Sequence, residues 1–303
     1  MRSFPTTTTF SGSFTALITP FRNGEIDEPA LRRLVDFQID NGTSGLVPCG
    51  TTGESVTMTH TEHARVVETV IDQAAGRIPV IAGTGTNNTR ITIEQTRHAQ
   101  SAGAAAALVV VPYYNKPTQE GLYRHYAAIA EASDLPLILY NVPGRTGINM
   151  QPDTILRLAE IPPVVGVKEA SGSLDQVSEI VIGAPGDFAV LSGDDSLTLP
   201  IMSVGGRGVI SVVSNIAPRP VADLTAAVLR GDFGTARAVH ARLFDLCRAM
   251  FIENNPTAVK TAAGILGLCT DEVRLPLTAM SDPNRRRLEA ALRAFGLTSA
   301  AAA

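Results

Sequence analysis

The chain has 303 residues, 45% of them hydrophobic and 18% charged, which is typical of a globular protein and allows one α/β barrel of about 250 residues with additions. Its 25 basic and 29 acidic side chains give a net charge of −4, which offers no basic surface to nucleic acid or to an anionic membrane. We therefore expect no nucleic-acid partner and no membrane partner.

Cysteine usage and the two ends of the chain indicate a reducing compartment. Cys49, Cys247 and Cys269 are odd in number and far apart, so they encode neither a disulfide framework nor a paired-cysteine metal site. The opening residues lack the continuous apolar stretch of a secretory signal, and no segment reaches the roughly 18 apolar residues of a membrane span. We expect a cytoplasmic protein whose opening threonine run and closing TSAAAA segment are loose ends.

Short apolar runs that end in Pro, Gly or polar residues predict eight β-strands. The runs recur at the spacing of repeated strand–helix units, with helical patterns between them. Each run is apolar on both faces, which is typical of a parallel sheet covered by helices. The predicted strands are residues 14–20, 45–48, 79–83, 107–112, 137–140, 164–168, 189–192 and 208–211.

Two of the helical segments begin with a capping-box pattern. Thr59 stands three residues before Glu62, and Ser173 stands three residues before Gln176. In a capping box the hydroxyl and the third side chain each accept from a backbone N–H group that would otherwise lack a partner. Both patterns therefore predict a helix start shortly after a strand.

The alternation of eight strands with helices predicts an α/β fold, the (β/α)8 TIM barrel, because eight parallel strands can close into a cylinder. After the eighth strand, residues 218–229, 233–250, 256–268 and 282–295 have helical patterns. We expect the first of these helices to complete the barrel and the others to form a C-terminal helical extension. The predicted division is a catalytic barrel over 1–225 and an extension over 226–303.

Lys168 ends the apolar run VVGVK. A lysine amine buried beside apolar surface loses its hydration, which favours the neutral, nucleophilic form. The alternative is a lysine whose stem covers apolar surface while its ammonium group reaches solvent. The neighbours of Lys168 decide between the two.

Polar residues that follow the other predicted strands would face the same mouth, because the carboxyl ends of all barrel strands open on one side. There a neutral amine could condense with a ketone to give an iminium, which lets a neighbouring proton leave and an enamine carbon attack an aldehyde. A phenol can move those protons, and a guanidinium can grip a carboxylate. Each residue alone also fits a turn or a surface position, but their convergence favours a site. They are Thr51, Thr52, Tyr113, Tyr114, Tyr140, Arg145 and Gly193.

Other patterns do not carry a site. GTGTNN begins like a dinucleotide-binding loop, but Asn88 stands where the third glycine is required. His60 and His63 form a helix pair without a third ligand, which is more often a solvated face than a metal site. The acidic residues after the sixth and seventh strands lack the phosphate-binding loop of a Mg²⁺ site. We predict no metal and no cofactor.

Several long motifs occur in one order: GTTGES, VPYYNKPTQEGLY, YNVPGRTG, GVKEASG, and SGDD followed by GGRGVIS. Together they resemble the pyruvate-dependent Schiff-base lyase family, also called the N-acetylneuraminate lyase family, and most closely its dihydrodipicolinate synthase branch. The resemblance runs from about residue 12 to 270. It implies a homo-oligomer, commonly a tetramer built as a dimer of dimers.

The resemblance implies the roles of four catalytic residues. Lys168 would form an imine with pyruvate, and Tyr140 would donate and accept protons. Thr51 would relay protons between Tyr140 and Tyr114, with Tyr114 reaching in from a neighbouring subunit.

The resemblance also implies the roles of four substrate-binding residues. Thr52 would hold the pyruvate carboxylate, Ile210 would supply a backbone contact, and Gly193 would leave room near the imine. Arg145 would receive the carboxylate of L-aspartate 4-semialdehyde, which gives 4-hydroxy-tetrahydrodipicolinate, a precursor of diaminopimelate and lysine. Sialate lyases of this family usually carry a small or apolar residue in that stretch, so the cation favours a short acidic aldehyde.

Feedback inhibition by lysine is expected to be weak or absent. Lysine-sensitive members have an effector pocket at a subunit interface, and this chain has Ile91 where they carry a glutamate. An ammonium group would lose its charged partner there, an interaction worth about 1.5–3 kcal/mol. The residues that match parts of the candidate effector pocket are Ser55, His60, His63, Asn87 and Tyr113.

Two alternatives stay open at this point. The first is a related class I aldolase that shares the imine and acts on another 2-oxo acid, which substrate assays would separate. The second is a non-catalytic small-molecule sensor on the same barrel, in which the lysine would not react.

Overall fold

The structure is a computed structural model, and it describes residues 10–297. Both segments expected to be loose ends, the opening threonine run and the closing TSAAAA, lie outside the described residues. Among the described residues, no helix combines the length and the hydropathy that a membrane crossing requires.

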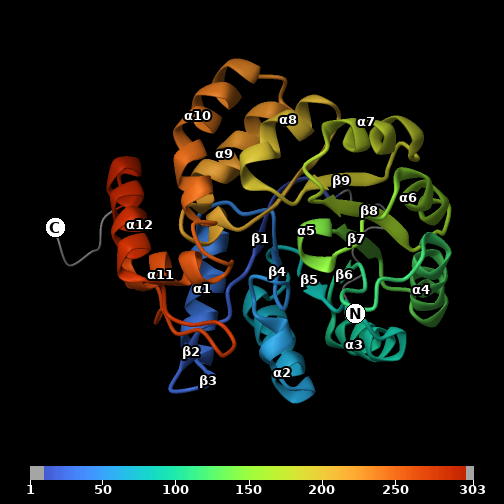
Figure 1. Cartoon of the computed structure of the whole chain (residues 1–303), viewed down its shortest axis with the longest axis horizontal. Helices are drawn as coiled ribbons and strands as arrows, with labels where there is room; N and C mark the ends of the chain where they lie inside the picture. Colours follow the sequence, from blue (N-terminus) through green and yellow to red (C-terminus); the bar gives the residue numbers. More distant parts are fainter. Residues whose placement is uncertain (1–9, 298–303) are drawn as a thin grey trace.

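Eight parallel strands form the centre of the molecule (Figure 1). Their order is β4-β1-β10-β9-β8-β7-β6-β5, and a parallel bridge between Leu46 and Val80 joins the two ends of this order into a barrel. All eight predicted strands are confirmed. Their bounds are β1 Gly12–Ala16, β4 Gly45–Val47, β5 Ile81–Gly83, β6 Ala106–Val110, β7 Leu137–Asn141, β8 Val164–Glu169, β9 Ala189–Ser192 and β10 Gly208–Ser211.

The first strand ends earlier than its apolar pattern predicts, at Ala16 instead of residue 20. The N–H of Ile18 donates to Asn215 Oδ1 (3.0 Å) instead of to a strand, and Pro20 has no N–H to donate. A two-stranded hairpin, β2 (Phe21–Arg22) and β3 (Glu25–Ile26), follows. This hairpin was not among the predicted elements, although the Asn-Gly pair at its turn is a strong hairpin signal.

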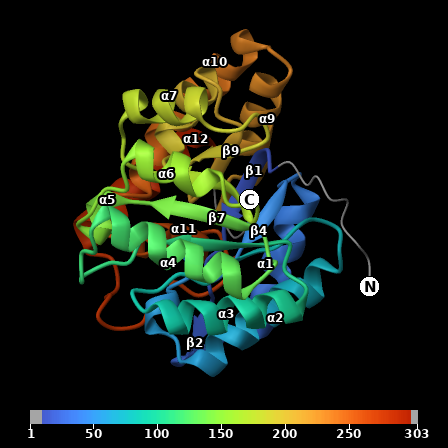
Figure 2. The same ribbon diagram turned by 90° about the vertical axis from the view of Figure 1, so that its right-hand side faces the viewer.

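Helices surround the barrel, and Figure 2 shows α2, α3, α4, α6 and α7 in this outer layer. Helix α2 illustrates the cause: His63, Val66, Val67 and Val70 are buried at spacings of three and four residues, so one face packs inward. The helices of this part are α1 Glu28–Asp40, α2 His60–Ala74, α3 Thr89–Ala102, α4 Gln119–Ala132, α5 Pro143–Thr146, α6 Pro152–Ala159, α7 Leu174–Gly183, α8 Thr198–Ser203 and α9 Pro218–Leu229, with 3₁₀ turns η1 Ser55–Thr57, η2 Asp195–Leu197 and η3 Val213–Asn215.

One predicted capping box is confirmed and the other is half formed. Thr59 and Glu62 make both reciprocal hydrogen bonds at the start of α2. Ser173 Oγ accepts from the N–H of Gln176 (3.2 Å), but Gln176 does not return the bond. Its side chain donates to the buried carboxylate of Glu169 (3.0 Å) instead, since an unpaired buried carboxylate is more costly than an exposed backbone N–H.

The C-terminal extension consists of α10 (Phe233–Ala249), α11 (Thr257–Ile265) and α12 (Asp282–Phe295), drawn in orange to red in Figure 1. Its three helices are confirmed, with α11 shorter than its predicted range. Helix α10 packs on α9 and α12, and α11 contacts α12 and η3. The predicted division at residue 225 falls inside α9 and remains a prediction.

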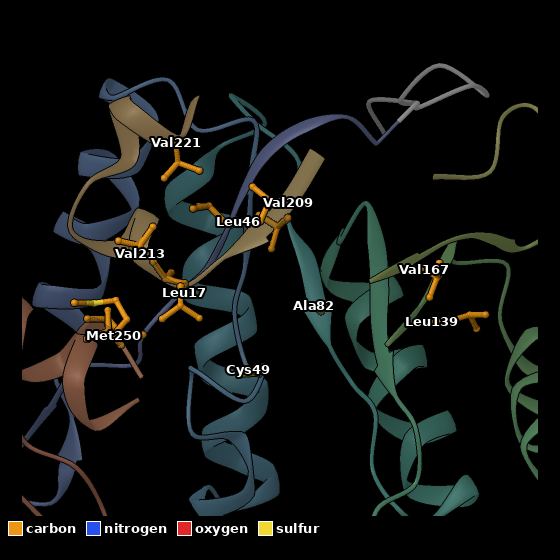
Figure 3. Close-up of a cluster of buried hydrophobic side chains, with 14 of the residues drawn as sticks. Leu17, Leu46, Cys49, Ala82, Leu139, Val167, Val209, Val213, Val221 and Met250 are labelled. Carbon is orange, nitrogen blue, oxygen red and sulfur yellow. The ribbon is translucent and has the colours of Figure 1, made fainter. Parts of the chain in front are cut away.

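The apolar core has two parts. One fills the barrel interior and includes Phe14, Ile138 and Ile210. The other lies between the barrel and the helices, and Figure 3 shows part of it, where Leu17 and Met250 belong to one cluster. Each large side chain buried in this way stabilises the fold by about 1.5–3 kcal/mol. Because apolar side chains fill the interior, the polar residues of the candidate site lie at the carboxyl ends of the strands.

Candidate active site

Lys168 lies on β8 with only 5% of its surface exposed. Its register partner on the neighbouring strand β7 is Tyr140, and both side chains belong to the same mouth of the barrel because paired residues of parallel strands point to the same face. Lys168 Nζ lies 4.1 Å from the centroid of the Tyr140 ring. The structure therefore brings together the two residues predicted to carry covalent and proton-transfer chemistry.

Gly193 leaves the space that the Lys168 side chain occupies. It follows β9, and its N–H donates to the carbonyl of Glu169 (2.7 Å), which fixes it beside β8. A Cβ atom at this position would lie 3.2 Å from Lys168 Cε and 2.6 Å from the Cβ of Ala170. A larger residue would clash with Ala170 and crowd the lysine stem, so the predicted need for room beside Lys168 has a steric cause.

A cavity of about 210 Å³ opens beside Tyr140. Its size suits small organic acids better than a nucleotide cofactor. Thr51, Tyr113, Tyr140 and Arg145, all predicted from the sequence, contribute to its wall. The lining residues are Cys49, Gly50, Thr51, Ser55, Val56, Gly83, Gly85, Leu108, Val110, Tyr113, Tyr140, Val142, Arg145 and Thr146.

Thr52 belongs to the loop after β4 and is 2% exposed. Asn255, just before α11, donates from Nδ2 to Thr52 Oγ1 (3.0 Å). The same loop is anchored by Glu54, whose Oε1 lies 2.6 Å from Lys260 Nζ in an ion pair with both side chains almost fully buried. No sequence pattern predicts these contacts of Asn255 and Lys260, because more than 200 positions separate both residues from the loop.

Arg145 lies in α5, the short helix after β7, and its Nη2 donates to the carbonyl of Asn255 (3.3 Å). The segment around it is held by Asn141, whose Nδ2 donates to Asn149 Oδ1 (2.7 Å) and to the carboxylate of Glu169. Arg145 therefore places a cation on a fixed segment at the wall of the cavity, and its binding of a carboxylate stays a prediction.

Glu169 follows Lys168 and points to the other face of β8, as alternation along a strand requires. It is 1% exposed and accepts from the N–H of Ser171 (2.7 Å) and from Asn141 and Gln176. Burial raises the pKa of Glu169, and these hydrogen bonds oppose the rise. No role for Glu169 is predicted from the sequence, and its hydrogen bonds connect β8 with β7 and α7.

Two aspartates follow β9 close to the lysine. Burial raises the pKa of Asp194 and of Asp195, and the positive charge of Lys168 opposes the rise at both. Asp195 Oδ2 accepts from the N–H groups of Val212 (2.9 Å) and Val213 (3.0 Å). Both aspartates also border a hollow of about 730 Å³ between the barrel and helices α10 and α12.

Ile210 lies on β10 in the barrel interior, fully buried, with Phe14 as its partner on β1. On the intervening strand, Leu191 pairs with Lys168 on one side and with Gly208 on the other. Ile210 is thus two residues beyond the level of the lysine, toward the carboxyl end of the strands. This is the side of the barrel on which the predicted site residues gather.

The two tyrosines after β6 differ. Tyr113 is half-buried in the wall of the cavity, and burial raises the pKa of its phenol. Tyr114 is 89% exposed, with φ +73°, a left-handed backbone conformation that is uncommon outside glycine. Within one chain the structure does not bring Tyr114 to the cavity that Tyr140 lines.

The candidate effector residues are only partly gathered in one chain. Ser55 and Tyr113 line the same cavity, and Asn87 accepts at its carbonyl from Asn115 (3.0 Å). His60 is exposed at the start of α2, whereas His63 is buried and its Nε2 lies 2.7 Å from the carbonyl of Gly83. Burial lowers the pKa of His63.

Comparison with known proteins gives one consistent result. The family model described as the Dihydrodipicolinate synthetase family matches residues 9–295. A relative from Thermomicrobium roseum named 4-hydroxy-tetrahydrodipicolinate synthase is 60% identical over 281 residues, 93% of each chain. One from Pelobacter propionicus with the same name is 55% identical and covers 95% of this chain and 99% of the relative.

Solved structures agree. Dihydrodipicolinate synthase from Aquifex aeolicus superposes with a TM-score of 0.95 at 51% identity, covering 96% of this chain and all of the other. A structure of the enzyme from Cyanidioschyzon merolae with lysine bound has a TM-score of 0.93 at 41% identity, covering 95% and 99% of the two chains. The fold, the order of the motifs and the near-complete coverage lead to one conclusion: the chain belongs to the dihydrodipicolinate synthetase family.

Proposed function

We propose that the protein is a 4-hydroxy-tetrahydrodipicolinate synthase, a lyase of lysine and diaminopimelate biosynthesis that joins pyruvate to L-aspartate 4-semialdehyde. The observation that carries the proposal is the buried amine of Lys168 against the ring of Tyr140, with Gly193 leaving space beside it. The names of the full-length relatives support the same reaction.

The first half of the reaction activates pyruvate. The Lys168 amine adds to the keto carbon, and the oxygen leaves as water with a proton from the Tyr140 phenol, which gives an iminium on Nζ and a phenolate at Tyr140. The iminium withdraws electrons, so a methyl proton can pass to the Tyr140 oxygen and leave an enamine. Thr52 and the backbone of Ile210 hold the pyruvate carboxylate, and Thr51 relays protons from Tyr140.

The second half forms the carbon–carbon bond. Arg145 binds the carboxylate of the semialdehyde, and the enamine carbon attacks its aldehyde carbon while Tyr140 returns a proton to the new alkoxide. The amino group of the semialdehyde then attacks the imine carbon, which closes the ring and releases the Lys168 amine. The product contains both substrates less one water.

Borohydride reduction in the presence of pyruvate tests the covalent step. Of the three lysines in the chain, Lys116, Lys168 and Lys260, only Lys168 should carry the reduced adduct after peptide mapping. Lys168→Arg should abolish trapping, whereas Lys116→Arg, a change at an exposed lysine, should preserve it. An adduct on another lysine, or none, refutes the proposed chemistry.

Arg145→Ala tests the second substrate. Loss of a charged hydrogen-bonding partner should lower kcat/KM for the semialdehyde about tenfold to hundredfold, with little change in borohydride trapping of pyruvate. Equal loss of both would point to a general disturbance of the site and would defeat the assignment of Arg145 to the aldehyde.

We propose that the enzyme is a cytoplasmic homotetramer, a dimer of dimers, in which Tyr114 completes the site of a neighbouring subunit. The exposure of Tyr114 and its left-handed backbone support this role. The three cysteines are free thiols, which fits the reducing conditions of the cytoplasm. Mixing inactive Lys168→Arg and Tyr114→Phe chains tests it. Mixed oligomers regain activity if Tyr114 acts between subunits, and stay inactive if it acts within its own.

A further inference from the structure

We propose that Asn255 is a positioning residue that directs the Thr52 hydroxyl to donate to the pyruvate carboxylate and couples it to the guanidinium of Arg145. Asn255 belongs to the C-terminal extension, outside the barrel that carries the chemistry. The inference rests on the proposed roles of Thr52 and Arg145, and it deepens them by explaining what orients both carboxylate-binding groups.

The side chain of Asn255 fixes the polarity of the Thr52 hydroxyl. A threonine hydroxyl has one proton to donate and two lone pairs. Asn255 Nδ2 fills one lone pair by donating to Thr52 Oγ1 at 3.0 Å, with both residues buried. The proton of Thr52 is then directed away from Asn255, which gives the site a donor, the group that a carboxylate requires.

Contacts that do not involve Asn255 hold the rest of the Thr52 loop. The direction of the Thr52 O–H bond is therefore what the Asn255 amide determines. The carbonyl of Gly53 accepts from Thr19 Oγ1 (2.8 Å). Glu54 pairs with Lys260 at 2.6 Å and also accepts from the N–H of Arg274 (3.0 Å). Removal of the Asn255 amide should therefore change the orientation of one O–H group and leave the loop in place.

The backbone of Asn255 makes the second connection. Its carbonyl accepts from Arg145 Nη2 at 3.3 Å, so one residue contacts the proposed binding group for each substrate. Within the described residues, Asn255 Oδ1 is buried without a hydrogen-bond partner. Such an atom lowers stability, so the amide is better explained by the donor it supplies to Thr52 than by packing alone.

Two substitutions separate positioning from packing. Asn255→Ala should raise the pyruvate concentration for half-maximal borohydride trapping about tenfold, since one buried hydrogen bond is lost. Asn255→Asp keeps the shape but accepts the Thr52 proton and adds a negative charge near the pyruvate carboxylate, so its effect should be larger. A packing role predicts the reverse order, because Ala removes more volume, and the reverse order overturns the proposal.

The KM values add a readout that a structural role would not produce. The Ala variant retains the backbone carbonyl that binds Arg145 and adds no charge, so its KM for the semialdehyde should stay within about twofold while its KM for pyruvate rises. Equal increases in both KM values overturn the proposal. Should the Ala variant fail to fold, Asn255→Ser, whose hydroxyl is too short to replace the amide, takes its place.

A double-mutant cycle tests whether Asn255 acts through Thr52. In a Thr52→Val background, Asn255→Ala should change the half-saturating pyruvate concentration less than about twofold. The same effect in both backgrounds refutes the coupling. Failure of the wild-type enzyme to trap pyruvate on Lys168 defeats the proposed function, whereas wild-type trapping with unchanged pyruvate saturation in the Asn255 variants defeats only this inference.

Discussion

The barrel and the C-terminal extension contribute to the site in different ways. The barrel supplies the proposed reacting groups at the ends of adjacent strands, Lys168 on β8 and Tyr140 on β7. The extension supplies residues that hold the loop after β4, namely Asn255, Lys260 and Arg274. The difference teaches that strand register places Lys168 beside Tyr140, whereas the loop that carries Thr52 depends on contacts with a distant part of the chain.

The contacts of the extension include charges removed from water. The side chains of Lys260 and Glu54 are 0% and 1% exposed, and burial lowers the pKa of Lys260 while Glu54 opposes this. A buried ion pair adds little stability beyond an apolar pair, but removal of one partner leaves an uncompensated charge. If the extension mainly supports the fold, its variants should change stability more than chemistry.

Lys260→Met should produce the largest effect. The buried Glu54 carboxylate loses its partner, and the free energy of unfolding should fall by about 3–5 kcal/mol, measured by urea denaturation at pH 7. The folded fraction should still trap pyruvate on Lys168. Lys116→Met, at an exposed position, should change stability by less than about 0.5 kcal/mol.

A small loss of stability in Lys260→Met would contradict the view that the extension anchors the loop. Partial recovery on adding Glu54→Gln would support it, because the second change removes the uncompensated charge.

Gly193→Ala should have the opposite profile, with a larger effect on chemistry than on stability. The added Cβ would lie 2.6 Å from the Cβ of Ala170 and 3.2 Å from Lys168 Cε, so Ala170 must shift and the Lys168 stem is crowded. Misplacement of a reacting group by about 1 Å can lower the rate about a hundredfold, and the rate of borohydride trapping measures it.

The matched control is Gly186→Ala, where an added Cβ meets no atom within 4 Å. Its trapping rate should stay within about twofold of wild type, as for a surface substitution away from the site. Wild-type trapping by Gly193→Ala would show that the barrel tolerates displacement of its nucleophile.

The fold was largely predictable because it depends on local patterns, and the same patterns indicate Lys168 and Tyr140 as candidate reacting groups, a role that stays a prediction. Eight apolar runs correspond to eight strands, and residues at or just past the ends of β4, β6 and β7 line one cavity. The end of β1 was not predictable, since Ile18 bonds to Asn215, whose position no local pattern reveals. Asn255 was missed for the same reason, and the role of Gln176 changed because Glu169 is buried beside it.

Glu62→Gln should give a smaller, pH-dependent loss of stability. Hydrogen bonding from Arg274, a residue between α11 and α12, lowers the pKa of Glu62 to about 2. Because the folded pKa lies below the usual value, this stability is present above about pH 4.5 and is lost as the pH falls toward 2. Gln retains the capping bond to Thr59 and removes the charge.

The measurement is urea denaturation of both proteins across that pH range. Glu62→Gln should be less stable by about 2 kcal/mol at pH 7, with the difference vanishing near pH 2. Glu289→Gln, in the partly exposed pairs with Arg285 and Arg293, should cost less than about 0.5 kcal/mol at any pH. If the difference in free energy of unfolding between Glu62→Gln and the wild type does not change with pH, the ion pair is excluded as its cause.

The smallest expected effect concerns inhibition by lysine and a residue of the barrel part, Ile91. It lies in the first turn of α3, where its N–H donates to Asn88 Oδ1 (3.3 Å), and it supplies no charge for an ammonium group. We expect weak or absent inhibition of the enzyme by lysine.

Ile91→Glu should strengthen inhibition at least about tenfold, since a charged hydrogen bond contributes about 1.5–3 kcal/mol. Ile91→Gln, of similar shape and without the charge, should resemble the wild type. Tight inhibition of the wild-type enzyme would show that the other candidate effector residues suffice, and equal inhibition of the Glu and Gln variants would show that charge at this position does not decide lysine binding.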